Sequence, residues 1–133
     1  MKSLYPSVAA RAGHRCEYCR APEAVFNLPF EVEHIIPSSR QGTDDESNLA
    51  LACRACNLHK RNYMTGPDHL TQSEVRSYDP RRDQWNEHFD PDLETGELYG
   101  LTPIGRATVT RLQMNTSVQL EARRKWMRLR LFP

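Results

Sequence analysis

The residues with the clearest chemistry are four cysteines in two pairs of identical spacing, Cys16-x-x-Cys19 and Cys53-x-x-Cys56. This spacing allows both sulfurs of a pair to bind one tetrahedral Zn²⁺ at about 2.3 Å. The duplication favours zinc over the alternatives, which are two disulfides, a redox-active pair and buried structural thiols. Because four thiolates fill the coordination shell, we expect a structural zinc and look for reactive groups elsewhere.

His34 is the first candidate for a reactive group. It lies between the two pairs, in a segment longer than the roughly 15–20 residues common in zinc sites of this spacing. A neutral imidazole can accept a proton from water near pH 7, as a general base must. Residue type alone leaves two interpretations open, because a single histidine can also pack beside a zinc knuckle as a structural side chain.

Three motifs around the cysteines resemble the HNH endonuclease family in content, order and spacing. They are Glu33-His-Ile-Ile-Pro37, Asn48-Leu49 and Cys53-x-x-Cys56-Asn57-x-x-Lys60. The resemblance covers about residues 14–62. It implies a ββα-metal finger, bracketed by the two cysteine pairs, that hydrolyses DNA phosphodiester bonds with the help of a divalent ion.

The same resemblance implies roles for individual residues. His34 takes the place of the general base that activates water. Asn48 holds the following loop and the His34 backbone by hydrogen bonds, although capping of the next turn explains this asparagine equally well. Glu33 and Asn57 offer oxygen ligands to a catalytic Mg²⁺ or other divalent cation, which prefers such donors.

Two residues depart from the family pattern. Glu33 stands where the residue before the base is more often aspartate, and Asn57 stands where the name-giving motif has its last histidine. Geometry adds a condition, because neighbours in a regular strand point to opposite faces. If Glu33 and His34 serve one site, the strand must end or bend there, and Pro37 is consistent with that.

Basic side chains near the second cysteine pair are candidates for contacts to DNA phosphates. Lys60, Arg54 and Arg61 lie on or beside the expected metal-bearing helix. Lys60 is the strongest of them because it matches the motif. A solvated helix face explains each of the three at least as well.

The net charge of +1 hides an uneven distribution of charge. Residues 1–66 hold 8 basic and 7 acidic side chains, residues 67–100 hold 3 and 9, and residues 101–133 hold 7 and 1. A basic tail of this kind could clamp a DNA backbone, with a solvated face as the alternative. Five of its basic residues lie in the expected last helix, namely Arg123, Arg124, Lys125, Arg128 and Arg130.

The elements that must position these residues are short, and their mixture predicts an α+β fold. We expect a helix over residues 6–13, a hairpin of two strands within 26–36, an irregular loop over 37–47 and a helix from the second cysteine pair to about residue 62. Residues 65–68 form a cluster of chain breakers. They place a boundary between a nuclease core at 1–66 and an extension at 67–133.

The extension is expected to hold a second hairpin, formed by residues 84–89 and 96–101, and two helices. The first helix starts at Thr102-Pro103, and a break near Asn115-Thr116 separates it from the second. Residues 100–109 look like the extension of some small stand-alone bacterial HNH proteins. Because a finger alone is too small to bury a large core, we expect this part to give structural support.

The length of 133 residues allows one modest core with an extension. Without a signal-peptide run or the roughly 20 apolar residues of a membrane span, we expect a soluble, cytoplasmic monomer or weak dimer with no membrane partner. The leading hypothesis is a DNA endonuclease, either cutting both strands or acting as a nickase. The alternatives are a zinc-stabilised nucleic-acid-binding module with a decayed nuclease site and a zinc-stabilised protein-interaction domain.

Overall fold

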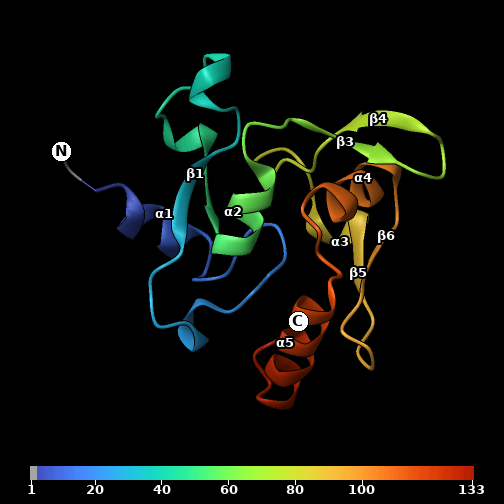
Figure 1. The fold of residues 1–133 in the computed structure, drawn as a ribbon. Coiled ribbons are helices and arrows are strands. Elements are labelled where there is room, and N and C mark those ends of the chain that lie inside the picture. The colour runs from blue at the N-terminus through green and yellow to red at the C-terminus, as the bar shows by residue number, and fades with distance from the viewer. Residues whose placement is uncertain (1–2) are drawn as a thin grey trace.

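The computed structural model describes residues 3–133 and confirms the α+β class (Figure 1). Within these residues the strands form three separate two-stranded antiparallel sheets, and helices pack beside each of them. No helix in the described part of the chain is long and apolar enough to cross a membrane. The fold is therefore a set of small hairpins whose side chains must share a core.

The first half contains the expected finger. Helix α1 (Tyr5–Arg11) leads to the first cysteine pair, β1 (Glu31–His34) pairs with β2 (Leu49–Ala52), and α2 (Arg54–Lys60) follows directly. The prediction of a complete hairpin within residues 26–36 is wrong, because only its second half is a strand. Residues 49–52 supply the partner strand, and all four of them are buried, which accounts for their unbroken apolar sequence.

The loop after β1 is irregular, as predicted, and contains two short 3-10 turns at Ser38–Arg40 and Glu46–Asn48. Gly42 allows the loop to fold back on its own start, where its backbone N–H donates to the Pro37 carbonyl at 2.9 Å. A Cβ at Gly42 would lie 1.7 Å from the Ile36 carbonyl oxygen. Any side chain at this position would therefore displace the loop.

The predicted chain-breaker cluster at residues 65–68 is a strand instead. Strand β3 (Thr65–Asp68) pairs with β4 (Ser73–Arg76), and this hairpin packs on α4 (Pro103–Arg111). Asp68 is buried and accepts hydrogen bonds from the Arg106 guanidinium at 2.7 and 3.1 Å, which hold the pKa of its carboxyl well below the usual range. This long-range ion pair stabilises a segment whose local sequence favours a turn.

The remaining elements follow the prediction closely. A short helix α3 (Trp85–His88) precedes a hairpin of β5 (Phe89–Pro91) and β6 (Leu98–Gly100), which is shorter than expected because residues 85–88 turn helically. Thr102 caps α4, Thr116 caps α5 (Ser117–Arg128), and the chain breaks between them as predicted.

The two halves of the chain share one hydrophobic core that includes the cysteines. The indole Nε1 of Trp85 donates to the Tyr18 carbonyl at 2.8 Å, and the Arg20 guanidinium lies 4.0 Å from the centre of the Trp85 ring. On α5, Trp126 lies against Phe26, with 6.0 Å between ring centroids. The second half therefore packs directly against the segments that carry the first cysteine pair.

Candidate metal centre and active cleft

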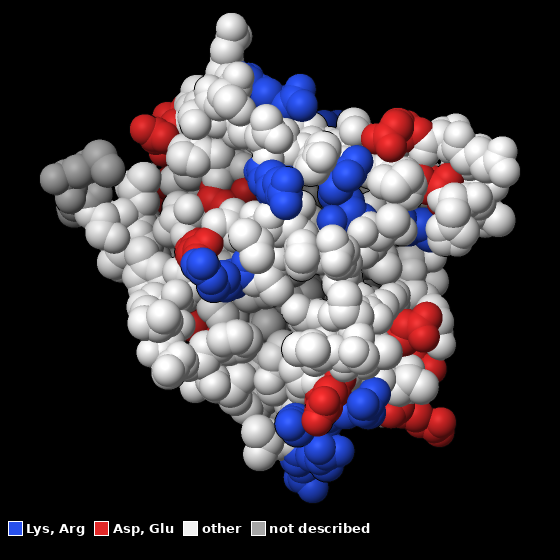
Figure 2. Space-filling view, viewed as in Figure 1, with Lys and Arg blue, Asp and Glu red and all other residues white. Residues whose placement is uncertain are grey.

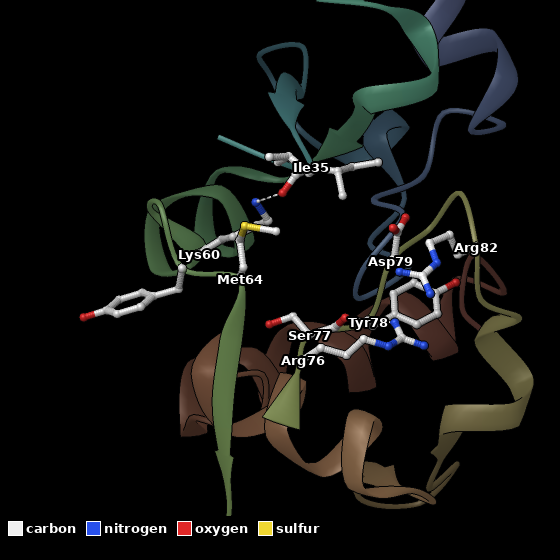
Figure 3. A pocket seen from close by; sticks show the side chains of 10 residues that line it. Ile35, Lys60, Met64, Arg76, Ser77, Tyr78, Asp79 and Arg82 are labelled. Atoms are coloured by element: carbon white, nitrogen blue, oxygen red, sulfur yellow. Dashed lines mark hydrogen bonds between the residues drawn. The ribbon is translucent and has the colours of Figure 1, made fainter. Parts of the chain in front are cut away.

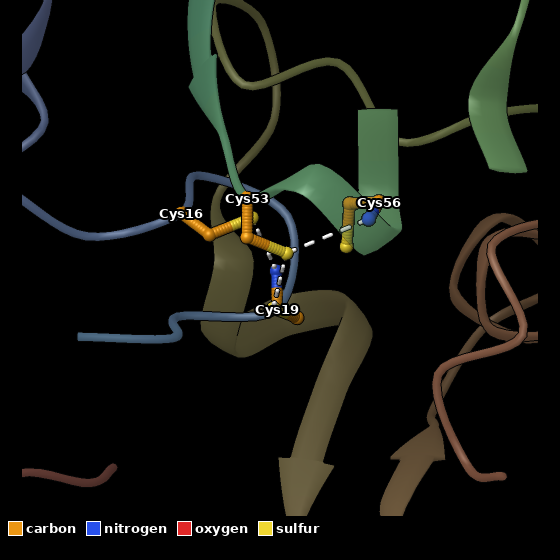
Figure 4. A group of neighbouring side chains, drawn as sticks. All are labelled: Cys16, Cys19, Cys53 and Cys56. Carbon is orange, nitrogen blue, oxygen red and sulfur yellow. Dashed lines mark hydrogen bonds between the residues drawn. The ribbon is translucent and has the colours of Figure 1, made fainter. Parts of the chain in front are cut away.

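The four cysteines meet at one point beneath the N-terminus of α2 (Figure 4). Their sulfur atoms all lie within 4.8 Å of one another, and all four residues are buried. Cys53 caps α2, with its sulfur accepting from the Cys56 backbone N–H at 3.5 Å. Four converging sulfurs fit a tetrahedral Zn²⁺ with no open coordination position.

The electrostatics of this cluster are consistent with a bound cation. The neighbouring thiols and burial raise the pKa of Cys19 and of Cys56 well above the ordinary value, whereas the neighbouring thiols lower the pKa of Cys53. Without a cation, Cys19 and Cys56 would therefore keep their protons. A divalent ion bound to all four sulfurs would displace these protons, as coordination deprotonates thiols.

His34 is the last residue of β1, and its ring is partly exposed. Its Nε2 atom lies 2.7 Å from Oδ1 of Asp44, a residue of the loop that Gly42 folds back. The Asp44 side chain is 83% exposed. Because the loop also contains Asp45 and Glu46, the sequence alone does not distinguish Asp44 from its acidic neighbours. Asp44 is a candidate functional residue that the sequence prediction missed.

Asn48 ties the two ends of the same loop together. Its amide oxygen accepts from the Ile36 backbone N–H at 2.8 Å, and its amide nitrogen donates to the carbonyls of Ile36 at 3.0 Å and Thr43 at 2.8 Å. These bonds hold the backbone just beyond His34 rather than His34 itself. Asn48 precedes a strand, so it does not cap a following turn.

Glu33 is buried and engaged on both carboxylate oxygens. Tyr18 donates its hydroxyl to Oε1, and the Lys60 ammonium lies 3.0 Å from Oε2. Burial raises the pKa of Glu33, and Lys60 and Tyr18 act in the opposite direction. A carboxylate oxygen has two lone pairs, so these contacts leave room for one further partner.

Lys60 does not fit its expected contact with DNA phosphate. Its ammonium is buried and donates to the Ile35 carbonyl at 3.1 Å (Figure 3). It also donates to the His34 carbonyl at 3.0 Å and to Glu33. The prediction treated the motif position as a surface charge because a sequence does not show which carbonyls face a lysine. The structure makes Lys60 an internal support of the end of β1.

Asn57 and Arg54 both contact Glu31, two residues before Glu33 on the same strand. The Asn57 amide nitrogen donates to Glu31 Oε2, and Arg54 Nη1 lies 3.2 Å from Glu31 Oε1. In residues 3–133 the Asn57 amide oxygen accepts no hydrogen bond. That oxygen is therefore available to a ligand, whereas the exposed Arg54 is already half of an ion pair.

An open hollow of about 320 Å³ brings the expected site residues together. Both Glu33 and His34 line it, at the end of β1. The hollow is lined by Val32, Glu33, His34, Pro37, Ser38, Ser39, Asn57, Arg61 and Asn62. Two oxygen donors line it, the Glu33 carboxylate and the Asn57 amide oxygen. These donors suit a hard divalent ion that is held by few protein oxygens and several waters.

The basic tail is only partly a surface feature. Lys and Arg side chains gather over α5, at the opposite end of the view from the loop after β1 (Figure 2). Arg123, however, is fully buried, and it donates to the carbonyls of Gly96, at 2.6 Å, and Met114. It must be removed from the predicted phosphate clamp, whereas Arg128 and Arg130 are exposed.

A comparison with known protein families finds a match over the finger. Residues 16–63 match the family model described as HNH endonuclease. No curated protein and no solved structure matches the chain. The matched segment begins at the first zinc-type cysteine and runs past the end of α2, so it contains every residue of the hollow.

Proposed function

We propose that this chain, whose residues 16–63 form an HNH endonuclease domain, is a metal-dependent hydrolase of DNA phosphodiester bonds. The observation that carries the proposal is the convergence of His34, Glu33 and Asn57 on one open hollow. A histidine, a carboxylate and an amide oxygen are the groups that such a reaction needs for proton transfer and ion binding. Structural zinc in the four-cysteine cage holds the strand and helix that carry them.

His34 acts as the general base in this proposal. An ionised Asp44 can only accept a hydrogen bond, so a neutral His34 ring keeps its proton on Nε2 and its lone pair on Nδ1. Nδ1 then takes a proton from water as the oxygen attacks phosphorus, and the bond from phosphorus to the leaving oxygen breaks. Asp44 is a positioning residue, since it acts through the ring rather than on the substrate.

Glu33 and Asn57 are the proposed ligands of the catalytic cation, with Mg²⁺ as the natural ion. When bound, such an ion stabilises negative charge on the phosphate and on the leaving oxygen. Glu33 shares its carboxylate with Lys60 and Tyr18, so its donor strength is reduced. We expect weak ion binding that needs excess metal.

The proposed substrate contacts are Arg61 on the rim of the hollow and, in a lesser role, Arg54. The exposed arginines of the tail would add affinity that depends on salt and not on base sequence. We expect the protein to act in the cytosol, where thiols stay reduced, as a monomer or weak dimer. Whether one or both strands are cut is part of the same test.

The test is cleavage of supercoiled plasmid in a series of added divalent metals. Conversion to open-circle or linear DNA, dependent on Mg²⁺ or Mn²⁺ in excess, is expected, and the product form distinguishes a nickase from a double-strand endonuclease. A second candidate is a zinc-stabilised DNA-binding module with a decayed site, favoured by the engagement of both Glu33 oxygens. DNA binding without cleavage in every metal would establish that candidate instead.

A further inference from the structure

Arg61 has a backbone conformation that side chains avoid. It follows the last residue of α2, with φ at 49° and ψ at −128°. A positive φ with this ψ lies outside the left-handed helical region, and glycine is the residue that reaches it readily. Gln41 also has a positive φ, but its ψ of 24° places it in the left-handed region that other residues visit.

No contact of the Arg61 side chain with residues 3–133 explains why an arginine occupies this position. The backbone N–H of Arg61 donates to the Asn57 carbonyl at 3.2 Å, a bond that glycine would make equally well. The side chain is exposed and forms no hydrogen bond or ion pair with any residue from 3 to 133. The backbone conformation belongs to a turn that the Tyr63 N–H closes by donating to the Lys60 carbonyl at 3.0 Å, and such a turn favours glycine over arginine at this position.

The location of Arg61 suggests a role for its side chain. Its side chain lines the hollow together with His34 and Asn57. A second cation is near the same rim, because Arg40 Nε donates to the carbonyl of Asn62 at 3.0 Å. The carboxylate of the hollow, Glu33, is already paired with Lys60, so it offers little competition for an arginine fork.

We propose that the strained backbone at Arg61 points a free guanidinium at a phosphate of the bound DNA, next to the bond that is cut. This inference rests on the proposed function. An arginine fork matches the oxygens of a phosphate, and strained residues persist at sites where their side chains bind ligands. Arg61 is then a substrate-binding residue that lowers the stability of the free protein.

The test separates strain from charge with three substitutions. Arg61→Gly removes the guanidinium and relieves the backbone strain, whereas Arg61→Ala removes only the guanidinium. Arg82→Ala is the control, because it removes an exposed arginine from outside the hollow. Thermal unfolding is measured for each. Binding to a short duplex is measured across a salt series without added divalent metal and in a His34→Ala background, so that cleavage does not interfere.

Arg61→Gly should raise Tm by several degrees, whereas Arg61→Ala should leave it nearly unchanged. Both should weaken DNA binding about tenfold and reduce the slope of log K against log salt by about 0.9, as expected for one lost phosphate contact. Arg82→Ala should change neither the affinity nor the slope as much.

Two results would overturn the inference. If Arg61→Gly binds DNA with the affinity and salt slope of its parent, the guanidinium contacts no phosphate. If Arg61→Gly and Arg61→Ala have the same Tm, the backbone is not strained. Failure of the proposed function is distinct, because it would show as absent cleavage by the protein with Arg61 and His34 both intact.

Discussion

At the scale of single residues, the reactivity of His34 depends on the orientation and tautomer of its ring. The ring sits at the end of a strand, and the contact that orients it in the described structure is the one to Asp44 at 2.7 Å. Because Asp44 is exposed, this contact by itself contributes little to stability. Its importance would be in selecting the nitrogen that accepts the proton.

Asp44→Asn should therefore impair turnover without unfolding the protein. An asparagine amide can donate to the ring and stabilise the wrong tautomer, so we expect kcat to fall by roughly 10²-fold, the lower end of the contribution of general-base catalysis, with KM little changed. Asp44→Glu should restore part of the rate. Steady-state kinetics on a plasmid substrate gives both constants.

Asp45→Asn is the matched control, because Asp45 is an exposed neighbour whose carboxylate contacts only Thr43 among the described residues. It should keep nearly the full rate. Equal losses in the two variants would mean that the loop needs acidic charge in general, and an unimpaired Asp44→Asn would remove Asp44 from the site.

Single residues were predictable from the sequence when their chemistry was encoded by a local motif. The cysteine spacing is of this kind, because the four sulfurs that it brings together do converge. The roles of Glu33 and His34 stay predictions. Asp44 could not be predicted, because in sequence it is indistinguishable from Asp45. Lys60 was assigned to DNA because its acceptors, the carbonyls at the end of β1 and Glu33, come from a segment more than twenty residues away.

At the scale of elements, the four-cysteine cluster joins the loop after α1 to the N-terminus of α2. The paired strands between these segments are only four residues long, and so small a hairpin is marginal in water by itself. A metal bound by the four cysteines would therefore fix the positions of His34 and Asn57 relative to each other.

Removal of the metal should unfold the finger. We expect about one zinc per chain by elemental analysis, and chelation should abolish cooperative unfolding, since structural zinc contributes roughly 10–16 kcal/mol in isolated fingers. Cys53→Ser should behave like the chelated protein. A metal-free preparation that keeps its circular dichroism and its Tm would contradict this account of the cage.

Elements with strong local signals were predicted well, and elements made by distant contacts were not. The threonine caps at 102 and 116 mark both C-terminal helices in the sequence. The local sequence of strand β3 predicts a turn. The ion pair that stabilises the strand joins Asp68 to Arg106, which is 38 residues away in the sequence. The partner of β1 was misplaced for the same reason, since pairing at long range has no local sequence signal.

At the scale of the whole molecule, Arg123 is a buried charge of the second half on which the four cysteines of the first half act electrostatically. It is fully buried on α5 and bonds to the backbone at Gly96 and Met114. Burial lowers its pKa, and the negative charge of the four cysteines acts in the opposite direction. Arg123 thus places a positive charge near the cage, which has a net negative charge when four thiolates bind Zn²⁺.

Arg123→Met should be among the most destabilising substitutions on α5. It leaves buried carbonyls without donors and the cage without its counter-charge, for which we expect roughly 3–5 kcal/mol, as for the loss of one partner from a buried charged contact. Arg124→Met is the control, because Arg124 makes one exposed bond to the Thr95 carbonyl. Urea denaturation of the zinc-loaded proteins measures both.

Similar stabilities for the two variants would mean that α5 packs on the finger without electrostatic coupling. The general role of residues 67–133 as support could be predicted from size, because a finger cannot bury a large core alone. The burial of the Arg123 side chain could not be predicted, because in the sequence Arg123 belongs to a run of basic residues.

The central claim is that His34 is the base of a metal-dependent DNA endonuclease. Its most direct test is the initial rate of plasmid cleavage in Mg²⁺ for the unmodified protein, His34→Ala and His69→Ala, which removes an exposed histidine outside the hollow. We predict that His34→Ala loses at least 10²-fold in rate while keeping its Tm, its zinc and its DNA affinity. His69→Ala should cleave normally. Cleavage by His34→Ala at the rate of the unmodified protein would contradict the claim.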